Sequence, residues 1–493
     1  LFFQQLEQWG AKTLWLAEEH LYLNIKFIQE CVNSKSAWAI LNPHFQTLLQ
    51  HVVAPILKPT EETLEIFESD PQEYINRYLE AWNEDYSPDF AAVDFLKTCI
   101  KRRPKYTLKP TLEYISSNLS QNFGESSNIT NAIEIESSLR IFSNIVEKLV
   151  SKNSNYVDQV EQFLTSFVLP MFDSPYGFLK ARACEIFFQL GDFTFKNINI
   201  TRAIYTNILR CFTESNDENI PVVLYSAVCM QVYIADPEFQ ETVKPIVLPI
   251  MEKLLKVSND LETDILSGVL QEFVEQFSEE LKPFGVELMN NLVQQFLKLA
   301  IDLNEASNFD INAIGSEGLP DEHSKQTTAV SIVSTIISIL LCFENSKEIV
   351  KSLEQSFYPA AEYVLNNEME DFYHDVCDFF DNSCFLTCSV SPIAWKILEL
   401  IGELNRKEDS TVGFYLESFM LLIKNYFIYG KQELTKNQFY ADIIFNVYCK
   451  SYGGEDADLD EINVAFNLSG HIILAMGANC PAAYLERLLT DTS

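Results

Sequence analysis

The sequence predicts an all-α protein: an α-α superhelix, or solenoid, of HEAT/armadillo-type repeats. Apolar residues recur at helical spacing, for example at Ile141, Ile145 and Leu149, and no comparable run alternates as a strand would. Gly and Pro are sparse, 15 and 18 of 493 residues, so the tight turns of β-sandwiches and barrels are few. Helices joined by short breaks are typical of an array in which each repeat packs on its neighbours.

A weak internal echo indicates the repeat length. The segments 53–56, 168–171 and 247–250 each read apolar-apolar-Pro-apolar. Successive copies are about 115 and about 80 residues apart, close to three and two units of roughly 40 residues, the HEAT period. We therefore interpret residues 1–493 as one continuous array, with a domain boundary at 304–324 as the alternative. Three stretches interrupt the helical pattern and are predicted long loops: 120–131, 304–324 and 451–460.

The net charge restricts the kinds of molecule that the chain can bind. The net charge is −35, from 70 acidic and 35 basic residues. Such a field repels phosphate backbones and anionic membrane surfaces and attracts basic proteins. We therefore expect no direct nucleic-acid binding and no membrane partner. A transmembrane helix is not expected either, because no stretch of about 18 uninterrupted apolar residues occurs. Simple solubility is the alternative explanation of the acidity.

Cysteine usage predicts the compartment. The eleven cysteines are irregularly spaced and sit mostly inside apolar helical patterns, as Cys184 does. This pattern favours reduced, buried thiols in a cytosolic or nuclear protein. The chain begins at Leu1 without Met or a basic leader, which predicts a fragment of a longer protein.

Patterns that carry catalysis or cofactor binding are absent from the sequence. There is no phosphate-binding glycine loop, no Gly-x-Gly-x-x-Gly and no Gly-x-Ser-x-Gly. The pair Cys384 and Cys388 lacks a second pair to complete a metal site. Asp456, Asp458 and Asp460 alternate as in a calcium loop, but Glu461 stands where the turn-making glycine is needed. We expect no catalytic residue, no cofactor and no metal, and hence no enzyme.

One basic stretch stands out, at residues 101–105. In isolation it could be a localisation signal or a phosphate patch. Because Pro104 interrupts a helix there, a turn between repeats is the favoured interpretation.

A motif near the start carries a resemblance to a known family. Asp70 and Pro71 begin a helix well, since Asp can cap the first turn and Pro suits its first position. Together with Tyr74 and Ile75 they form an Asp-Pro-x-Glu-Tyr-Ile segment. This segment resembles the middle of importin-β (karyopherin-β) family receptors, both the importin-seven/eight branch and the CAS-type exportin.

Further motifs follow in the same order as in the importin-seven/eight branch. Arg182 and Cys184 lie in a segment similar to its Arg-Ala-Cys helix, and Pro392 and Trp395 in one similar to its Val-Ser-Pro-x-x-Trp segment. We expect these motif residues to be structural. The resemblance implies the central and C-terminal portion of a receptor, with the N-terminal Ran-binding region absent. Other matching segments are 371–373, 386–388, 454–457 and 482–488.

The resemblance implies a nuclear import receptor. Such a receptor binds basic cargo, such as ribosomal proteins or histones, in the cytoplasm, crosses the pore on Phe-Gly nucleoporins and releases cargo when RanGTP binds. It would shuttle between cytoplasm and nucleus. Two alternatives remain: a CAS-type exportin, and a HEAT-repeat scaffold subunit of an enzyme complex.

Acidic side chains are the predicted contacts for basic cargo, because opposite charge speeds capture. Solvated surface acids are the competing interpretation of each. The predicted contacts form two groups: Glu61, Glu62, Glu65 and Glu68, and Glu455, Asp456, Asp458 and Asp460.

Overall fold

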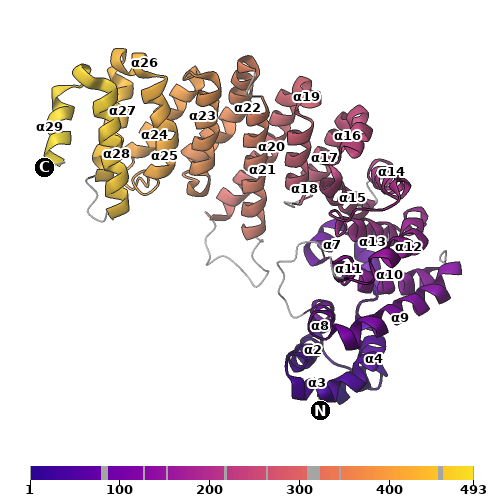
Figure 1. Cartoon of the computed structure of the whole chain (residues 1–493). Coiled ribbons are helices and arrows are strands. Elements are labelled where there is room, and N and C mark those ends of the chain that lie inside the picture. Colours follow the sequence, from indigo (N-terminus) through magenta and orange to yellow (C-terminus); the bar gives the residue numbers. More distant parts are fainter. Residues whose placement is uncertain are drawn as a thin grey trace. The chain divides into compact units, whose positions relative to one another are not determined.

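The all-α prediction is confirmed. The computed structural model describes residues 2–78, 87–125, 128–151, 154–215, 219–261, 265–307, 322–343, 346–452 and 459–491, and within these ranges every regular element is a helix (Figure 1). The chain divides into two compact units, residues 1–241 and 242–493. Each unit is described by itself.

The first unit consists of short and medium-length helices joined by tight turns. Several helices end in a 3-10 or π turn, among them η1 (Asn42–His44), η2 (Leu49–Val53), η3 (Phe123–Glu125), η4 (Leu164–Val168) and η5 (Leu169–Asp173). The α-helices are α1 (Phe2–Gly10), α2 (Glu18–Asn33), α3 (Lys35–Leu41), α4 (Phe45–Leu48), α5 (Ala54–Ile56), α6 (Glu61–Ser69), α7 (Pro71–Tyr78), α8 (Pro88–Arg102), α9 (Pro104–Asn122), α10 (Ile129–Ser143), α11 (Val146–Val150), α12 (Val157–Phe163), α13 (Gly177–Phe188), α14 (Ile198–Glu214) and α15 (Ile220–Tyr233); α16 (Pro237–Val243) spans the division.

The second unit contains longer helices. Its short turns include η7 (Lys244–Ile246), η8 (Lys282–Phe284), η10 (Glu370–Phe372) and η11 (Gly477–Asn479). Its α-helices are α17 (Val247–Asp260), α18 (Ile265–Gln276), α19 (Ser278–Leu281), α20 (Gly285–Ser307), α21 (Glu322–Cys342), α22 (Lys347–Asn366), α23 (Tyr373–Thr387), α24 (Pro392–Arg406), α25 (Leu416–Ile428), α26 (Lys431–Lys436), α27 (Gln438–Tyr452), α28 (Leu459–Met476) and α29 (Ala482–Asp491).

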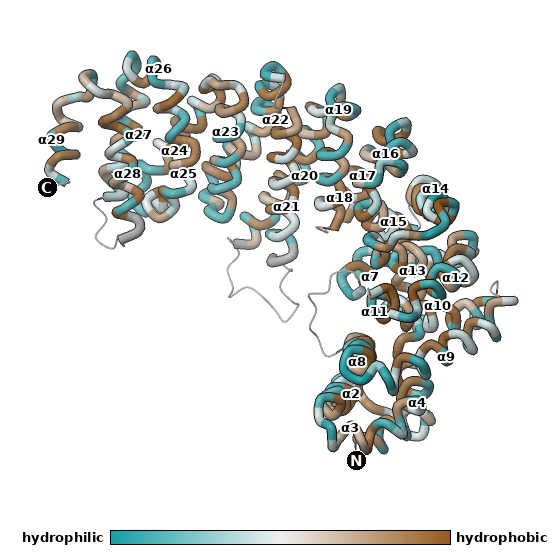
Figure 2. The backbone as a smooth tube through the Cα atoms, viewed as in Figure 1, coloured by the Kyte–Doolittle hydropathy of each residue, from teal (hydrophilic) through white to brown (hydrophobic). Residues whose placement is uncertain are grey.

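Helices pack on neighbours that are close in sequence. In the first unit α2 packs on α8, α9 on α10 and α13 on α15; in the second α20 packs on α21 and α22, and α23 on α25. Figure 2 shows hydrophobic and hydrophilic residues interleaved along most helices, so that each helix offers an apolar stripe to its neighbours. Large aromatic side chains such as Phe187, Phe212 and Phe357 fill these interfaces and are fully buried.

The three repeated proline segments, 53–56, 168–171 and 247–250, adopt two different structures. Before Pro55 and before Pro170 the helix widens into a π turn, η2 and η4. Because proline has no N–H, it cannot bond the carbonyl four residues earlier, and the regular ladder is interrupted. Pro249 instead lies in the first turn of α17, where a missing N–H costs nothing. The shared sequence pattern therefore marks helix ends in two copies and a helix start in the third.

Helices extend into all three predicted loops, so these loops are shorter than the sequence suggested. Parts of each loop lie outside the described residues. Within 120–131, α9 continues to Asn122, η3 follows, and Asn128 caps α10 by accepting a hydrogen bond from the Thr130 backbone N–H at 2.9 Å. Within 304–324, helix occupies both ends, and 308–321 lies outside the described residues. Within 451–460, residues 453–458 also lie outside the described residues. The single continuous array remains a prediction.

One helix is long and apolar enough to cross a membrane by length and composition. The window Lys325–Cys342 of α21 has a mean hydropathy of 1.5, and 44% of it is buried. This helix packs on α18, α20 and α23. We therefore interpret it as a core helix of the second unit, whose apolar residues serve helix packing.

Trp395 explains a matching motif as packing. Ser391 caps α24, accepting a hydrogen bond from the Ala394 N–H at 3.0 Å, and Pro392 occupies the first helical position. The Trp395 ring then lies 4.9 Å from that of Tyr426 and 4.4 Å from that of Tyr440, centroid to centroid. The expected structural role of this motif thus has a concrete basis: it positions an indole between two neighbouring helices.

Gly430 is constrained by this indole. A Cβ at position 430 would lie 2.8 Å from the Trp395 ring and 2.8 Å from the Tyr426 carbonyl oxygen. We expect Gly430→Ala to destabilise the chain by about 1–3 kcal/mol, as overpacking does. Gly470→Ala in α28 is the matched control, because a Cβ there meets nothing within 4 Å; it should stabilise slightly. Urea unfolding measures both, and equal effects of the two variants would contradict the packing argument.

Candidate functional site

Three predicted cargo contacts form an acidic face on α6. Thr60 caps this helix, accepting a hydrogen bond from the Thr63 N–H at 3.1 Å. Glu61, Glu65 and Glu68 are all exposed, and their spacing of four and three residues places them on one side. Among the described residues none of the three has an ion-pair partner. Their negative charges are therefore available to a partner in solution; we call this set the α6 acidic face.

Glu62 differs from the other three. It pairs with Arg77 at 3.1 Å, and the Arg77 Nε also bonds Glu73 at 2.5 Å. The hydrogen bonds that Arg77 donates to Glu73 and Glu62 raise the pKa of its guanidinium. The pair joins α6 to α7, so Glu62 is partly neutralised and contributes less to an attractive field than its neighbours do.

The second predicted group falls largely outside the described residues. Glu455, Asp456 and Asp458 lie in 453–458, and only the backbone of Asp460 is described, at the start of α28. Cargo contact by these four acids remains a prediction.

A second acidic face was missed from the sequence. Asp375, Asp378 and Asp381 lie on α23 at intervals of three residues and are half-buried. Asn382 donates to Asp378 at 3.0 Å, and Asn425 donates to Asp381. Burial, together with the neighbouring Asp378, raises the pKa of Asp375 to about 6 although His374 opposes it. The i, i+3, i+6 spacing was the available signal.

Arg182 lies at the centre of a buried ion cluster. Its Nε and Nη2 donate to one oxygen of Glu136 at 2.9 and 2.7 Å, and its Nη1 pairs with Glu185. The side chains of Arg182 and Glu136 are only 10% and 7% exposed. The cluster therefore ties α10 to α13 from inside the first unit.

Tyr74 of the Asp-Pro-x-Glu-Tyr-Ile motif reaches the same region. Asp70 caps α7 by accepting a hydrogen bond from the Glu73 N–H at 3.1 Å, Pro71 begins the helix, and Ile75 is fully buried. The hydroxyl of Tyr74 hydrogen-bonds Tyr225 of α15. Burial raises its pKa to about 12, against the opposing field of Arg182. The motif thus fastens α7 onto the helices around Arg182.

Cys184 has a packing role. It is fully buried and hydrogen-bonds Cys211, with Cys229 close by. Burial raises the pKa of the Cys184 thiol, so it remains protonated. All eleven cysteines are free, and in the described part of the chain no group of three or more His, Cys, Asp or Glu is placed to hold a metal ion.

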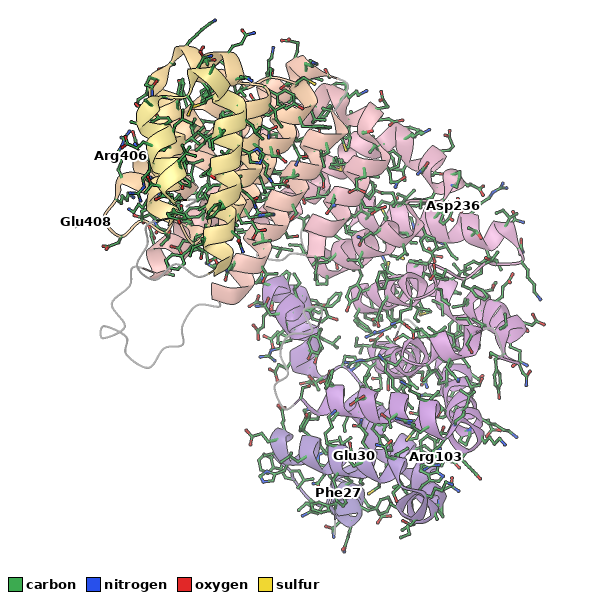
Figure 3. All side chains as sticks on the ribbon, turned by 60° about the vertical axis from the view of Figure 1, so that its left-hand side comes forward. Phe27, Glu30, Arg103, Asp236, Arg406 and Glu408 are labelled. Carbon is green, nitrogen blue, oxygen red and sulfur yellow. The ribbon has the colours of Figure 1, made fainter. Side chains whose placement is uncertain are left out.

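The basic stretch at 101–105 forms a turn between helices, as favoured. α8 ends at Arg102 and α9 begins at Pro104. Between them, Arg103 (Figure 3) donates to the Val32 carbonyl oxygen from Nε and Nη2 at 3.0 and 2.9 Å. Its guanidinium also lies 5.7 Å from the centroid of the Trp38 ring. Arg103 therefore holds the end of α2 and is not free to bind phosphate.

An apolar pocket of about 270 Å³ opens between α17 and α20 in the second unit. Half of its ten lining residues are Leu or Met, and Phe284 of η8, 37% exposed, also lines it. Glu252 and Glu287 flank it. A pocket of this size and lining can take a single apolar side chain.

Comparison with known proteins supplies the family. The Cse1 family model matches residues 25–230. The chain is 51% identical over 492 residues to "Nonsense-mediated mRNA decay protein 5" of Saccharomyces cerevisiae, and 26% identical over 460 residues to Importin-8 of Homo sapiens. The chain is a member of the importin-β family. The two matches cover 99% and 92% of this chain but only 47% and 41% of the relatives. The chain therefore spans less than half of the relatives' length.

Solved structures agree with the importin-β family fold. The exportin Cse1 in its cargo-free, cytoplasmic state matches with a TM-score of 0.71 at 14% identity, covering 99% of this chain and 50% of that one. Two complexes of Kap95p also match at 13% identity. The one with RanGDP has a TM-score of 0.59 and covers 100% of this chain and 54% of that one. The one with Nup1 has a TM-score of 0.51 and covers 96% and 52%. At such identities the likeness concerns the fold alone, and it confirms the HEAT-type superhelix.

Breaking the buried ion cluster should cost more than breaking an exposed pair. We expect Arg182→Met to lower the free energy of unfolding by about 3–5 kcal/mol, because it leaves buried carboxylates unpaired. Arg202→Met is the control: its pair with Glu238 at 2.5 Å involves side chains 60% and 36% exposed, for which the loss should be below about 1 kcal/mol. Urea unfolding compares them. A loss at Arg182 no larger than at Arg202 would refute the structural role.

The raised pKa of Asp375 predicts a pH-dependent stability. Between the ordinary carboxyl range and pH about 6, the native state holds a proton that the unfolded state has lost, so stability falls as pH rises through this window. Asp375→Asn removes this dependence. We expect the variant to melt higher than the parent at pH 7 and at the same temperature near pH 4, with exposed Asp409→Asn as control. A gain that is equal at both pH values would argue against it.

Proposed function

We propose that this chain is a cargo-binding portion of a nuclear import receptor, which acts by binding and catalyses no reaction. The observation that carries the proposal is the similarity to Importin-8 over 92% of the chain. In this cycle the receptor binds a basic protein in the cytoplasm, passes the nuclear pore and releases its cargo when nuclear RanGTP binds. It would therefore shuttle between the two compartments.

Electrostatics support basic cargo. The net charge of −35 favours encounter with basic proteins such as ribosomal proteins or histones. The α6 acidic face supplies unpaired carboxylates on one side of a single helix. Attraction between exposed charges is screened by salt over roughly 8–10 Å, so cargo binding by this face should weaken as ionic strength rises.

Complexes of a structurally similar protein support Ran and nucleoporins as partners. Kap95p, which shares the fold, binds RanGDP and Nup1. We propose RanGTP and Phe-Gly nucleoporins as partners of the receptor to which this chain belongs. The apolar pocket between α17 and α20 is our candidate for a nucleoporin phenylalanine, since it fits one apolar side chain and Phe284 lines it.

The α6 acidic face can be tested by charge reversal. We expect Glu61→Lys, Glu65→Lys and Glu68→Lys together to weaken binding of a purified histone by about five- to ten-fold at low salt and to flatten its salt dependence. The control replaces three dispersed exposed acids, Glu19, Glu408 and Glu433, by Lys, which changes the net charge equally. Fluorescence anisotropy over a salt series measures both. Equal losses would show that only net charge matters and that this face is not a site.

Export is a second candidate, because the family model that matches is Cse1 and the exportin Cse1 shares the fold. An exportin loads its cargo together with RanGTP, whereas an importin releases it. Cargo pull-down with the full-length receptor, with and without RanGTP, separates the two. Release by RanGTP is expected; strengthened cargo binding would overturn the import proposal in favour of export.

A further inference from the structure

A polar groove of about 680 Å³ lies in the first unit, and none of the residues of the α6 acidic face lines it. Three elements that pack together line it: α4 with η2, α9 and α10 (Figure 1). The volume falls in the range of ligand-binding clefts, roughly 300–1,000 Å³. The lining is almost entirely polar: Gln46, Gln50, Glu113, Tyr114, Ser117, Asn118, Gln121, Asn122, Thr130, Asn131 and Glu134.

Carboxamides dominate this groove, and three of them are unengaged. Asn118 and Asn122 bond each other, Asn118 also contacting Tyr114 and Glu134. In the described part of the chain, Gln46, Gln50 and Gln121 make no side-chain hydrogen bond. Each carboxamide presents one carbonyl acceptor and an NH₂ donor side by side. That pairing complements a peptide group, which likewise presents one acceptor and one donor.

The charges around the groove are balanced. Lys58 pairs with Glu134, and Lys109 with Glu113 at 3.6 Å. The groove therefore offers hydrogen bonds without a strong local field, unlike the α6 acidic face. A ligand held here is recognised through neutral polar groups, and its binding should depend little on salt.

We propose that this groove binds an extended peptide segment of a protein partner through the segment's main chain. On α9 the lining runs from Glu113 to Asn122, a rise of roughly 13 Å at 1.5 Å per residue. That length accommodates roughly four extended residues. Gln46 and Gln50, one helical turn apart, line the other wall, so both edges of the strand find partners. The net charge of −35 disfavours nucleic acid as the occupant.

This site is independent of the proposed import function. Cargo capture by the α6 acidic face is predicted to be salt-sensitive, and peptide binding in the groove salt-insensitive. A variant that loses peptide binding but keeps histone binding, or the reverse, shows which of the two proposals fails.

The test uses a fluorescein-labelled nine-residue peptide of alternating Thr and Ser, residues that tolerate an extended backbone and carry no charge. We expect saturable binding to the whole chain by anisotropy, with less than a two-fold change in affinity between low and moderate salt. Gln46→Ala, Gln50→Ala and Gln121→Ala together should weaken it at least ten-fold. Gln355→Ala on α22, an exposed glutamine outside the groove, is the control and should leave affinity unchanged.

A backbone-modified peptide gives the sharper test. N-methylation at alternate peptide bonds removes main-chain donors without altering side chains, and should abolish binding. Each single Gln variant is expected to bind the peptide about two- to five-fold more weakly. These single variants keep the test valid if the triple variant folds poorly. Absence of binding by the Thr-Ser peptide, equal binding of the N-methylated peptide, or full affinity of the correctly folded triple variant would each overturn the proposal. Displacement by maltoheptaose at equal concentration would overturn it in favour of a sugar site.

Discussion

Within each of the two units, the described helices bury their apolar stripes against helices close to them in sequence, and the rest of the structure depends on that constraint. α13 packs on α15 in the first unit, and α20 on α21 and α22, and α23 on α25, in the second, so each of these interfaces is local. Such an array leaves the outer helix faces and the turns free to vary. The α6 acidic face, the apolar pocket and the polar groove all lie on such positions, which is where a helical array can carry binding surfaces.

The buried polar groups follow the same constraint. Arg182, Glu136 and Glu185 join α10 and α13, while Tyr74 brings α7 to Tyr225 of α15. A buried ion pair adds little net stability over an apolar contact, but breaking it is costly. We infer that the cluster selects which helices pair, since one misplaced partner would leave a charge buried alone. Arg182 and Tyr74, two of the motif residues that carried the family resemblance, therefore contribute to helix pairing.

The sequence predicted helices, their type of assembly and their capping residues well, because these depend on local patterns. Asp70 and Pro71 begin a helix as expected. The length of the 120–131 loop was wrong, since polar residues there continue α9 instead of ending it. The two forms of the Pro echo were also out of reach, because whether Pro lies at a helix end or start depends on neighbouring turns.

Surface function was less accessible from the sequence than the fold, because it depends on which side chains already have partners. Glu62 and Glu65 look alike in sequence, yet Arg77 neutralises only the first. The polar groove is the extreme case: Gln46 and Gln121 are 75 residues apart in numbering, and no pattern joins them until α4 and α9 pack together. Neutral amides also leave no signal in net charge. A receptor that combines a charged face with a neutral groove can attract partners by charge and discriminate among them by hydrogen bonding, two contributions that salt separates experimentally.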